Sequence, residues 1–155
     1  MNRVSEPEFW SKRLAAAKRR GEVHRSVYLT TLDGWAEVQS RHRAKLAECI
    51  MHTDTVLDAG CGYGSLLEVL PPVASYTGID TCEELLKEAR RLHPGRCFRN
   101  ADVADTGFPD KYFTVAVARS VRSMVLRELG EDAWKRMEAE LNRVAERVVY
   151  LEYSE

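Results

Sequence analysis

A carboxylate followed by three alternating glycines is the most distinctive motif of the chain. The segment reads Asp58-Ala-Gly60-Cys-Gly62-Tyr-Gly64, and it connects the apolar run 55–59 to a segment with helical spacing. Glycine allows the backbone to approach a ligand closely, and the amide groups at the start of a helix face such a ligand. The motif therefore predicts a turn that binds a nucleoside-containing cofactor.

The glycine spacing differs from that of dinucleotide-binding turns. Those turns carry the pattern G-x-G-x-x-G, whereas here the third position is Ser65. A carboxylate at the head of the turn would repel a pyrophosphate that lay against the same backbone, and it suits a ligand with a cationic amino group. Asp58 therefore disfavours NAD and flavin as cofactors.

Two further acids follow predicted strands. Asp80 ends the segment 75–80, and Asp102 comes shortly after the segment 97–100. In parallel sheets the carboxyl ends of the strands lie at one edge, where ligands bind. We expect Asp80 to accept hydrogen bonds from both hydroxyls of a ribose, and Asp102 to accept one from an adenine amino group. Val103 would supply a backbone N–H and an apolar surface beside the adenine.

The elements that must position these acids alternate between strands and helices. We predict strands over 55–59, 75–80, 97–100, 112–118 and 148–153, with apolar runs at 55–59 and 112–118. Helical spacing predicts helices over 8–20, 35–51 and 65–70, a helix that follows Thr81 as N-cap, and one or two helices between 124 and 147, broken at Gly130. This alternation predicts a parallel sheet with helices on both faces.

Composition places the chain among ordinary soluble domains. Of its 155 residues 45% are hydrophobic and 30% are charged, and 23 Lys and Arg stand against 24 Asp and Glu. This composition excludes disorder and membrane spans, and it gives no overall attraction to nucleic acid or lipid. The four cysteines stand singly and no secretory leader precedes them, so we expect reduced thiols and a cytoplasmic protein. The histidines have no ligand spacing, so we expect no metal.

The first 50 residues read as a helical extension or lid, and residues 51–155 read as the cofactor-binding core of a single domain. Within the extension, the segment 24–28 with Trp35 has two readings: a lid over the ligand, or ordinary packing on the sheet. The basic residues between Lys12 and Arg20 also have two readings, either an RNA contact or a solvated helix face.

The three motifs together resemble the class I S-adenosylmethionine-dependent methyltransferases. The resemblance rests on VLDAGCGYG (56–64), YTGID (76–80) and NADVADTGFPDKYFTVAVARS (100–120), and it covers about residues 45–153. It implies an α/β, Rossmann-like doubly wound sheet of order 3-2-1-4-5. It also implies S-adenosylmethionine as cofactor. The methionine part would lie at the glycine turn, the ribose at Asp80 and the adenine at Asp102. The implied cofactor-binding set is Asp58, Gly60, Cys61, Gly62, Gly64, Asp80, Thr81, Asp102, Val103 and Arg119.

The sequence departs from the pattern of this family in two ways. The family's sheet has seven strands, and this chain stops after the fifth, so the segment 148–153 would be an open edge. That edge suggests either a homo-oligomer or a truncated chain. After the fourth strand, residues 118–121 read Ala-Arg-Ser-Val, without the Asn/Asp-Pro-Pro-aromatic run of enzymes that methylate DNA amines. No Pro-Cys pair is present to methylate cytosine C5 either.

The resemblance implies methyl transfer by in-line attack on the sulfonium methyl. We expect a small-molecule acceptor, with RNA and protein acceptors left open. Candidate bases are His24, Tyr28 and Glu152, and Arg119 is a candidate substrate clamp. Two alternatives stay open: an enzyme that cleaves the cofactor or uses a modified form of it, and a non-catalytic module that binds the cofactor and acts through a partner.

Overall fold

The structure of the protein is a computed structural model, and it describes residues 7–21 and 32–153. The helices are α1 (Pro7–Arg20), α3 (Leu32–Cys49), the short 3-10 helix η1 (Ser65–Glu68), α4 (Glu83–Leu92), α5 (Val121–Glu128) and α6 (Glu131–Val144). The strands are β1 (Thr55–Ala59), β2 (Ser75–Asp80), β3 (Cys97–Asn100), β4 (Phe113–Arg119) and β5 (Ala145–Leu151).

The five strands form one parallel sheet of order β3-β2-β1-β4-β5, which confirms the predicted fold. Ala59 at the end of β1 pairs with Ile79 on β2 and with Ala118 on β4. Asp80 at the end of β2 pairs with Asn100 at the end of β3. The carboxyl ends of these four strands therefore meet at one edge, above which the chain turns into its loops and helices.

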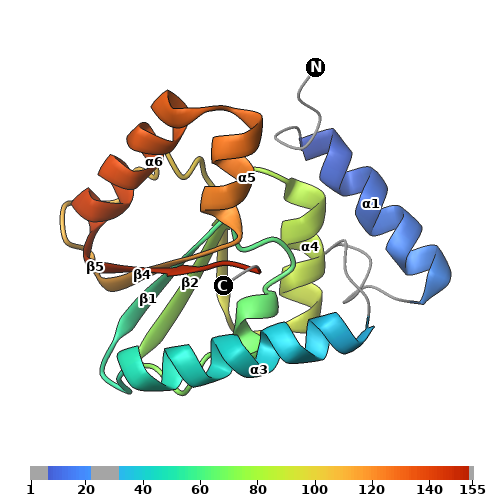
Figure 1. The fold of residues 1–155 in the computed structure, drawn as a ribbon, viewed down its shortest axis with the longest axis horizontal. Coiled ribbons are helices and arrows are strands. Elements are labelled where there is room, and N and C mark those ends of the chain that lie inside the picture. Colours follow the sequence, from blue (N-terminus) through green and yellow to red (C-terminus); the bar gives the residue numbers. More distant parts are fainter. Residues whose placement is uncertain (1–6, 22–31, 154–155) are drawn as a thin grey trace.

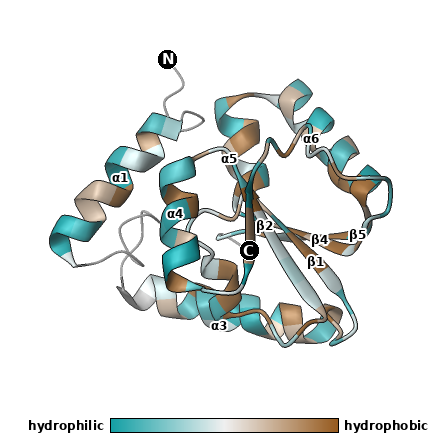
Figure 2. Cartoon of the chain, turned by 180° about the vertical axis from the view of Figure 1, so that it is seen from behind, coloured by the Kyte–Doolittle hydropathy of each residue, from teal (hydrophilic) through white to brown (hydrophobic). Residues whose placement is uncertain are grey.

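Helices cover both faces of the sheet, with α5 and α6 on one side and α3 on the other (Figure 1). Alternate residues of β4 serve the two faces: Ala116 and Ala118 pack with α5 and α6, whereas Val115 and Val117 pack with α3, η1 and α4. In Figure 2 the ribbon is brown near the β4 and β5 labels, β2 is pale, and much of the helical surface is teal. The near-continuous apolar run of β4 thus reflects burial on both faces.

Helix α1 lies against α4, outside the layer that covers the sheet (Figure 1). Its Leu14 and Ala17 are buried in a small apolar cluster with Leu85 of α4. Glu88 of α4, only 1% exposed, accepts from Lys18 of α1 at 2.7 Å and from Arg91 at 2.6 Å. These pairs hold the pKa of Glu88 down to about 2, with the hydrogen bond from Arg91 as the largest cause.

Several boundaries differ from those predicted, each for a local reason. The helix expected over 65–70 is only the single turn η1, because Gly64 at φ 86° precedes it and two prolines follow shortly after. The prediction that Thr81 is the N-cap of α4 is wrong. Cys82 holds that position, and the carboxylate of Asp80 accepts from its N–H at 2.9 Å. Strand β5 runs over Ala145–Leu151 rather than 148–153.

The break at Gly130, with φ 85°, separates α5 from α6 as expected. Among the described helices, no stretch is long and apolar enough to cross a bilayer.

Candidate functional site

A cavity of about 860 Å³ lies at the carboxyl ends of the strands, between the loops and the helices that follow them. Phe9 and Trp10 of α1, Arg41 of α3 and Met124 of α5 contribute to its walls. The predicted site residues that line it are Gly60, Gly62, Asp80, Thr81, Asp102, Val103 and Arg119. Asp58, Cys61, Gly64 and Glu152 are not among the lining residues, and His24 and Tyr28 lie outside the described residues.

The glycine turn between β1 and η1 brings the backbone to the cavity wall. Gly60 has φ +73°, and a Cβ there would lie 2.8 Å from Cγ2 of Val121. The N–H groups of Gly60 and Cys61 both donate to the carbonyl of Ile79, at 2.9 Å. Gly60 is thus required by its own backbone angle and by the close approach of α5, and the turn is tied firmly to β2.

Asp80 connects the end of β2 to the glycine turn. Its Oδ2 accepts from the N–H of Gly62 and its Oδ1 from the N–H of Cys82, both at 2.9 Å. Burial raises the pKa of Asp80, and these backbone donors oppose the rise. A carboxylate has about four acceptor positions, so Asp80 keeps the capacity to accept from a ligand in the cavity that it lines.

Asp58 lies beneath the cavity wall, 1% exposed, and its Oδ2 accepts from the hydroxyl of Tyr76 at 2.6 Å. Burial raises the pKa of Asp58 to about 7, while the hydrogen bond from Tyr76 and the positive charge of Arg119 act in the opposite direction. Cys61 is a packing residue: a Cβ on Gly78 would lie 2.9 Å from its sulfur. Burial also raises the pKa of its thiol, which makes it a poor nucleophile.

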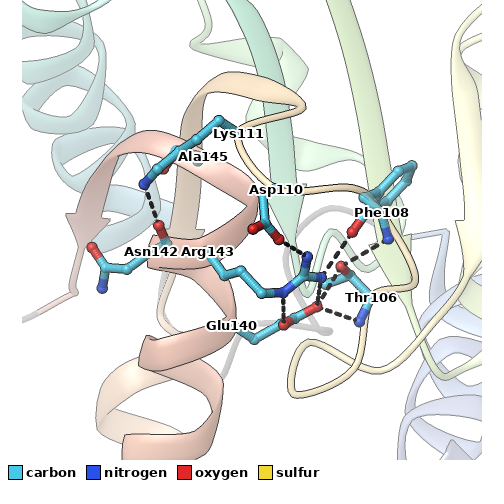
Figure 3. A network of polar contacts seen from close by, with 8 residues as sticks. All are labelled: Thr106, Phe108, Asp110, Lys111, Glu140, Asn142, Arg143 and Ala145. Carbon is cyan, nitrogen blue, oxygen red and sulfur yellow. Dashed lines mark hydrogen bonds and ion pairs between the residues drawn. The ribbon is translucent and has the colours of Figure 1, made fainter.

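Asp102 and Val103 belong to the loop between β3 and β4, and a polar network fastens this loop to α6 (Figure 3). Glu140 of α6 accepts from the N–H of Thr106 at 2.9 Å and from its hydroxyl at 2.7 Å. Arg143 donates to Glu140, to the carbonyl of Phe108 at 2.8 Å and to Asp110 at 2.6 Å. Arg143 holds the pKa of Glu140 down to about 2.

Arg119 leaves the end of β4 and is 7% exposed. It donates to Nδ1 of His42 at 3.0 Å and to the side-chain oxygen of Gln39, and its guanidinium lies over the ring of Trp35, 5.1 Å from its centroid. The expected clamp is therefore held in place by α3.

His42 was not a predicted site residue, and its coupling to Arg119 leaves no signal in the sequence. Its Nε2 donates to the carbonyl of Glu152 at 2.9 Å, since its Nδ1 accepts from Arg119. Burial, with the charges of Arg119, Arg41 and Lys45, lowers the pKa of His42 to about 4. The imidazole is therefore neutral at physiological pH, and both ring nitrogens are occupied.

Glu152 does not line the cavity, so its placement argues against its expected role as a base. Its Oε2 accepts from the hydroxyl of Ser123 at 2.5 Å, and its Oε1 accepts from the N–H of Ser123 at 3.3 Å. Ser123 lies in the first turn of α5, whose N–H groups have no partners within the helix. Glu152 therefore caps this helix.

Ser120 is a lining residue that sequence reasoning missed. It is the N-cap of α5 at φ 59° and ψ 17°, but its side chain makes no capping bond. Its Oγ is buried without a hydrogen-bond partner in the described part of the chain. A left-handed serine directly after β4 leaves no mark in hydropathy or spacing, so only the backbone reveals it.

Comparison with known proteins agrees with this geometry. A family model described as a methyltransferase domain matches residues 57–151. A trans-aconitate 2-methyltransferase from Methylobacterium nodulans is 44% identical over 68 residues, which cover 40% of this chain and 26% of the relative. A protein of Mycobacterium tuberculosis named as a methyltransferase is 32% identical over 91 residues, which cover 57% of this chain and 54% of the relative. The chain thus spans between a quarter and about half of the length of these relatives.

Among solved structures, the magnesium protoporphyrin IX methyltransferase from Synechocystis PCC 6803, with bound S-adenosylmethionine, superposes with a TM-score of 0.67. The two chains are 20% identical, and the match covers 97% of this chain and 75% of the other. At this identity the likeness shows a shared fold.

Proposed function

The chain belongs to the methyltransferase domain family, and on this premise we propose that it binds S-adenosylmethionine and transfers the cofactor's methyl group to a small-molecule acceptor. One observation carries the proposal: Asp80, Asp102 and the Gly60–Gly62 turn come from three successive strand ends and line one cavity. Its volume of about 860 Å³ lies within the range of roughly 300–1,000 Å³ that is usual for ligand sites.

The residues of this cavity fit the cofactor. Asp80 would accept from the ribose hydroxyls, since it lines the cavity and its carboxylate retains acceptor capacity. Asp102, whose Oδ1 accepts from the N–H of Ala104 at 2.8 Å, would accept from the adenine amino group. Arg119 would bind the carboxylate of the methionine part, and the buried Asp58, once ionised, would supply a negative charge for its ammonium.

When bound, the cofactor supplies an electrophilic methyl group, so the protein's task is to align the acceptor and exclude water. Phe9, Trp10 and Met124 provide apolar walls for that purpose. No histidine, cysteine or lysine appears among the described residues that line the cavity. The described lining residues can therefore align the acceptor, but they do not include a histidine that could act as a base.

Charge on α1 favours a small acceptor over RNA. Lys12 pairs with Glu8 at 2.6 Å and Lys18 pairs with Glu88 at 2.7 Å, so two of the cations that would contact phosphates are already paired.

Self-association through β5 is also proposed, because β5 pairs only with β4 among the described strands. Sedimentation at several protein concentrations tests that second proposal, and a concentration-independent monomer contradicts it.

Calorimetric titration of S-adenosylmethionine and S-adenosylhomocysteine tests the cofactor. We expect micromolar binding to the wild type and to Asp105→Asn, an exposed carboxylate outside the lining. Asp80→Asn should bind about tenfold or more weakly, because a charge-assisted ribose contact is lost. Absence of binding to folded wild-type protein overturns the proposal. Product analysis then separates methyl transfer from cofactor cleavage, and binding without any turnover indicates a non-catalytic module.

A further inference from the structure

Apart from Glu37, the charged groups that line the cavity are separated by sign. Asp80 ends β2 and Asp102 follows β3, on one side of the central strand β1. The cations Arg41, Arg119 and Arg127 come from α3, β4 and α5, on the other side. The end of the cavity beyond the nucleoside residues is therefore positively charged, with Glu37 as its only acid among the described lining residues.

Two of these arginines form no ion pair with an acidic side chain within the described residues. Arg41 donates to the carbonyl of Tyr153 at 2.5 Å, and Arg119 donates to the neutral groups of Gln39 and His42. Arg127 differs, because it pairs with Glu128 at 2.8 Å. A cation that is partly or fully removed from water without a counter-ion is costly, and an anionic ligand removes that cost. The charges of Arg119 and Arg41 also add to burial in lowering the pKa of His42 to about 4.

Arg41 has more hydrogen-bonding capacity left than Arg119. Arg119 donates through Nε to His42, through Nη2 to Gln39 and through Nη1 to Ser65 at 3.4 Å. Arg41 uses one terminal nitrogen, so most of its five N–H groups remain for a ligand. The cofactor carries two positive groups and one carboxylate. It therefore neutralises at most one arginine and leaves the other for the acceptor.

We propose that the acceptor is a small organic carboxylate, held by Arg41 and methylated on a carboxylate oxygen. This inference rests on the proposed function. The attacking oxygen forms a bond to the methyl carbon, and the carbon–sulfur bond breaks with its electron pair passing to sulfur. The products are a methyl ester and S-adenosylhomocysteine, and no proton moves. A carboxylate is already ionised at neutral pH, so this reaction needs no general base and suits the lining described above.

The test uses a panel of small mono-, di- and tricarboxylic acids and the corresponding carboxamides. The full chain is incubated with S-adenosylmethionine, and the product is treated with mild alkali, which releases methanol from methyl esters. The same compounds are titrated calorimetrically into protein saturated with S-adenosylhomocysteine. We expect at least one acid to bind and to yield an alkali-labile methyl group, and its carboxamide to do neither.

Substitutions then test the role of Arg41. Arg41→Gln should lower kcat/KM for the acid by about tenfold to a hundredfold, mainly through KM, and Arg41→Lys should restore part of the loss. The affinity for S-adenosylhomocysteine should stay unchanged. Arg43→Gln is the matched control, because Arg43 lies on the same helix, is exposed and is not a lining residue.

Three results overturn the inference while leaving cofactor binding intact. The first is an alkali-stable methyl product, or binding of S-adenosylmethionine with no turnover of any acid in the panel. The second is unchanged kcat/KM for the acid in Arg41→Gln. The third is loss of turnover in Glu37→Gln, which would identify Glu37 as a base for a hydroxyl or amine acceptor. Failure of the wild type to bind S-adenosylmethionine would overturn the proposed function itself.

Discussion

Glu152 caps helix α5 through Ser123, accepting from its hydroxyl at 2.5 Å and from its backbone N–H at 3.3 Å. This relationship joins the residue that follows β5 to the first turn of the helix that follows β4. It explains how Ser120 can hold the N-cap position without making the usual side-chain bond. The Ser120 hydroxyl is thereby left without a capping partner.

Glu152→Gln should therefore act on stability. Removing a negative charge from the start of α5 should lower the free energy of unfolding by about 1 kcal/mol, and the affinity for S-adenosylmethionine should change by less than about twofold. Urea denaturation and calorimetry measure the two quantities. Glu146→Gln is the control, since Glu146 is exposed on β5. If Glu152→Gln keeps its stability but loses turnover, Glu152 acts as a base.

The sheet was predictable because its signals are local. Strands β1, β2 and β3 have the predicted bounds, and β1 is a short apolar run that ends just before a glycine. The order of the sheet followed from the resemblance, and the structure agrees with it. The helix over 65–70 failed because hydrophobic spacing does not reveal that the chain there has room for only one turn.

The site was predictable only where its residues follow strands. Asp80 and Asp102 could be placed from the ends of β2 and β3. Arg41 and His42 lie in a long helix, and their roles depend on which face of α3 meets Arg119 and Tyr153, a tertiary fact that spacing does not encode. The capping role of Glu152 likewise depends on a contact between elements that are 29 residues apart.

Ser120→Ala should separate stability from ligand binding. The Ser120 Oγ is buried without a partner in the described chain, and such a group costs about 1–3 kcal/mol. The alanine variant of the ligand-free protein should therefore be as stable as the wild type or more stable. If the hydroxyl serves a ligand, the same variant should weaken binding of S-adenosylmethionine or slow its turnover by about tenfold. A destabilised variant with unaltered binding would show that the hydroxyl has a structural partner instead.

Asp58 should make the stability of the ligand-free protein depend on pH. Burial raises its pKa from 3.8 to about 7, so the native state keeps a proton that the unfolded state has released. The contribution of Asp58 to the free energy of unfolding therefore falls as the pH rises between these two pKa values, and it is constant above them. In Asp58→Asn the free energy of unfolding should lose this dependence on pH. The variant should exceed the wild type in stability by the largest amount at about pH 8. Denaturation across that pH range measures it, with Asp105→Asn as control, and an unchanged slope contradicts the prediction.

The same group should influence cofactor binding in the opposite direction. If the ionised carboxylate of Asp58 balances the cofactor's ammonium, the affinity for S-adenosylhomocysteine should fall by about tenfold per pH unit below the native pKa. Asp58→Asn should bind more weakly at high pH and show a shallower dependence. If the affinity depends on pH equally in the two proteins, Asp58 does not contribute to cofactor binding.

Glu140→Gln should loosen the loop that carries Asp102. The carboxylate of Glu140, 11% exposed, holds Thr106 and Arg143, and Arg143 lowers its pKa to about 2. A lowered pKa stabilises the native state above the unfolded value of 4.5, and this contribution disappears as the pH falls towards the native value. The variant should lose about 1–3 kcal/mol near neutral pH, much less in acid, and bind S-adenosylmethionine more weakly. Glu131→Gln, at the exposed start of the same helix, should do neither. Full affinity in a destabilised Glu140→Gln would show that the loop position does not depend on this network.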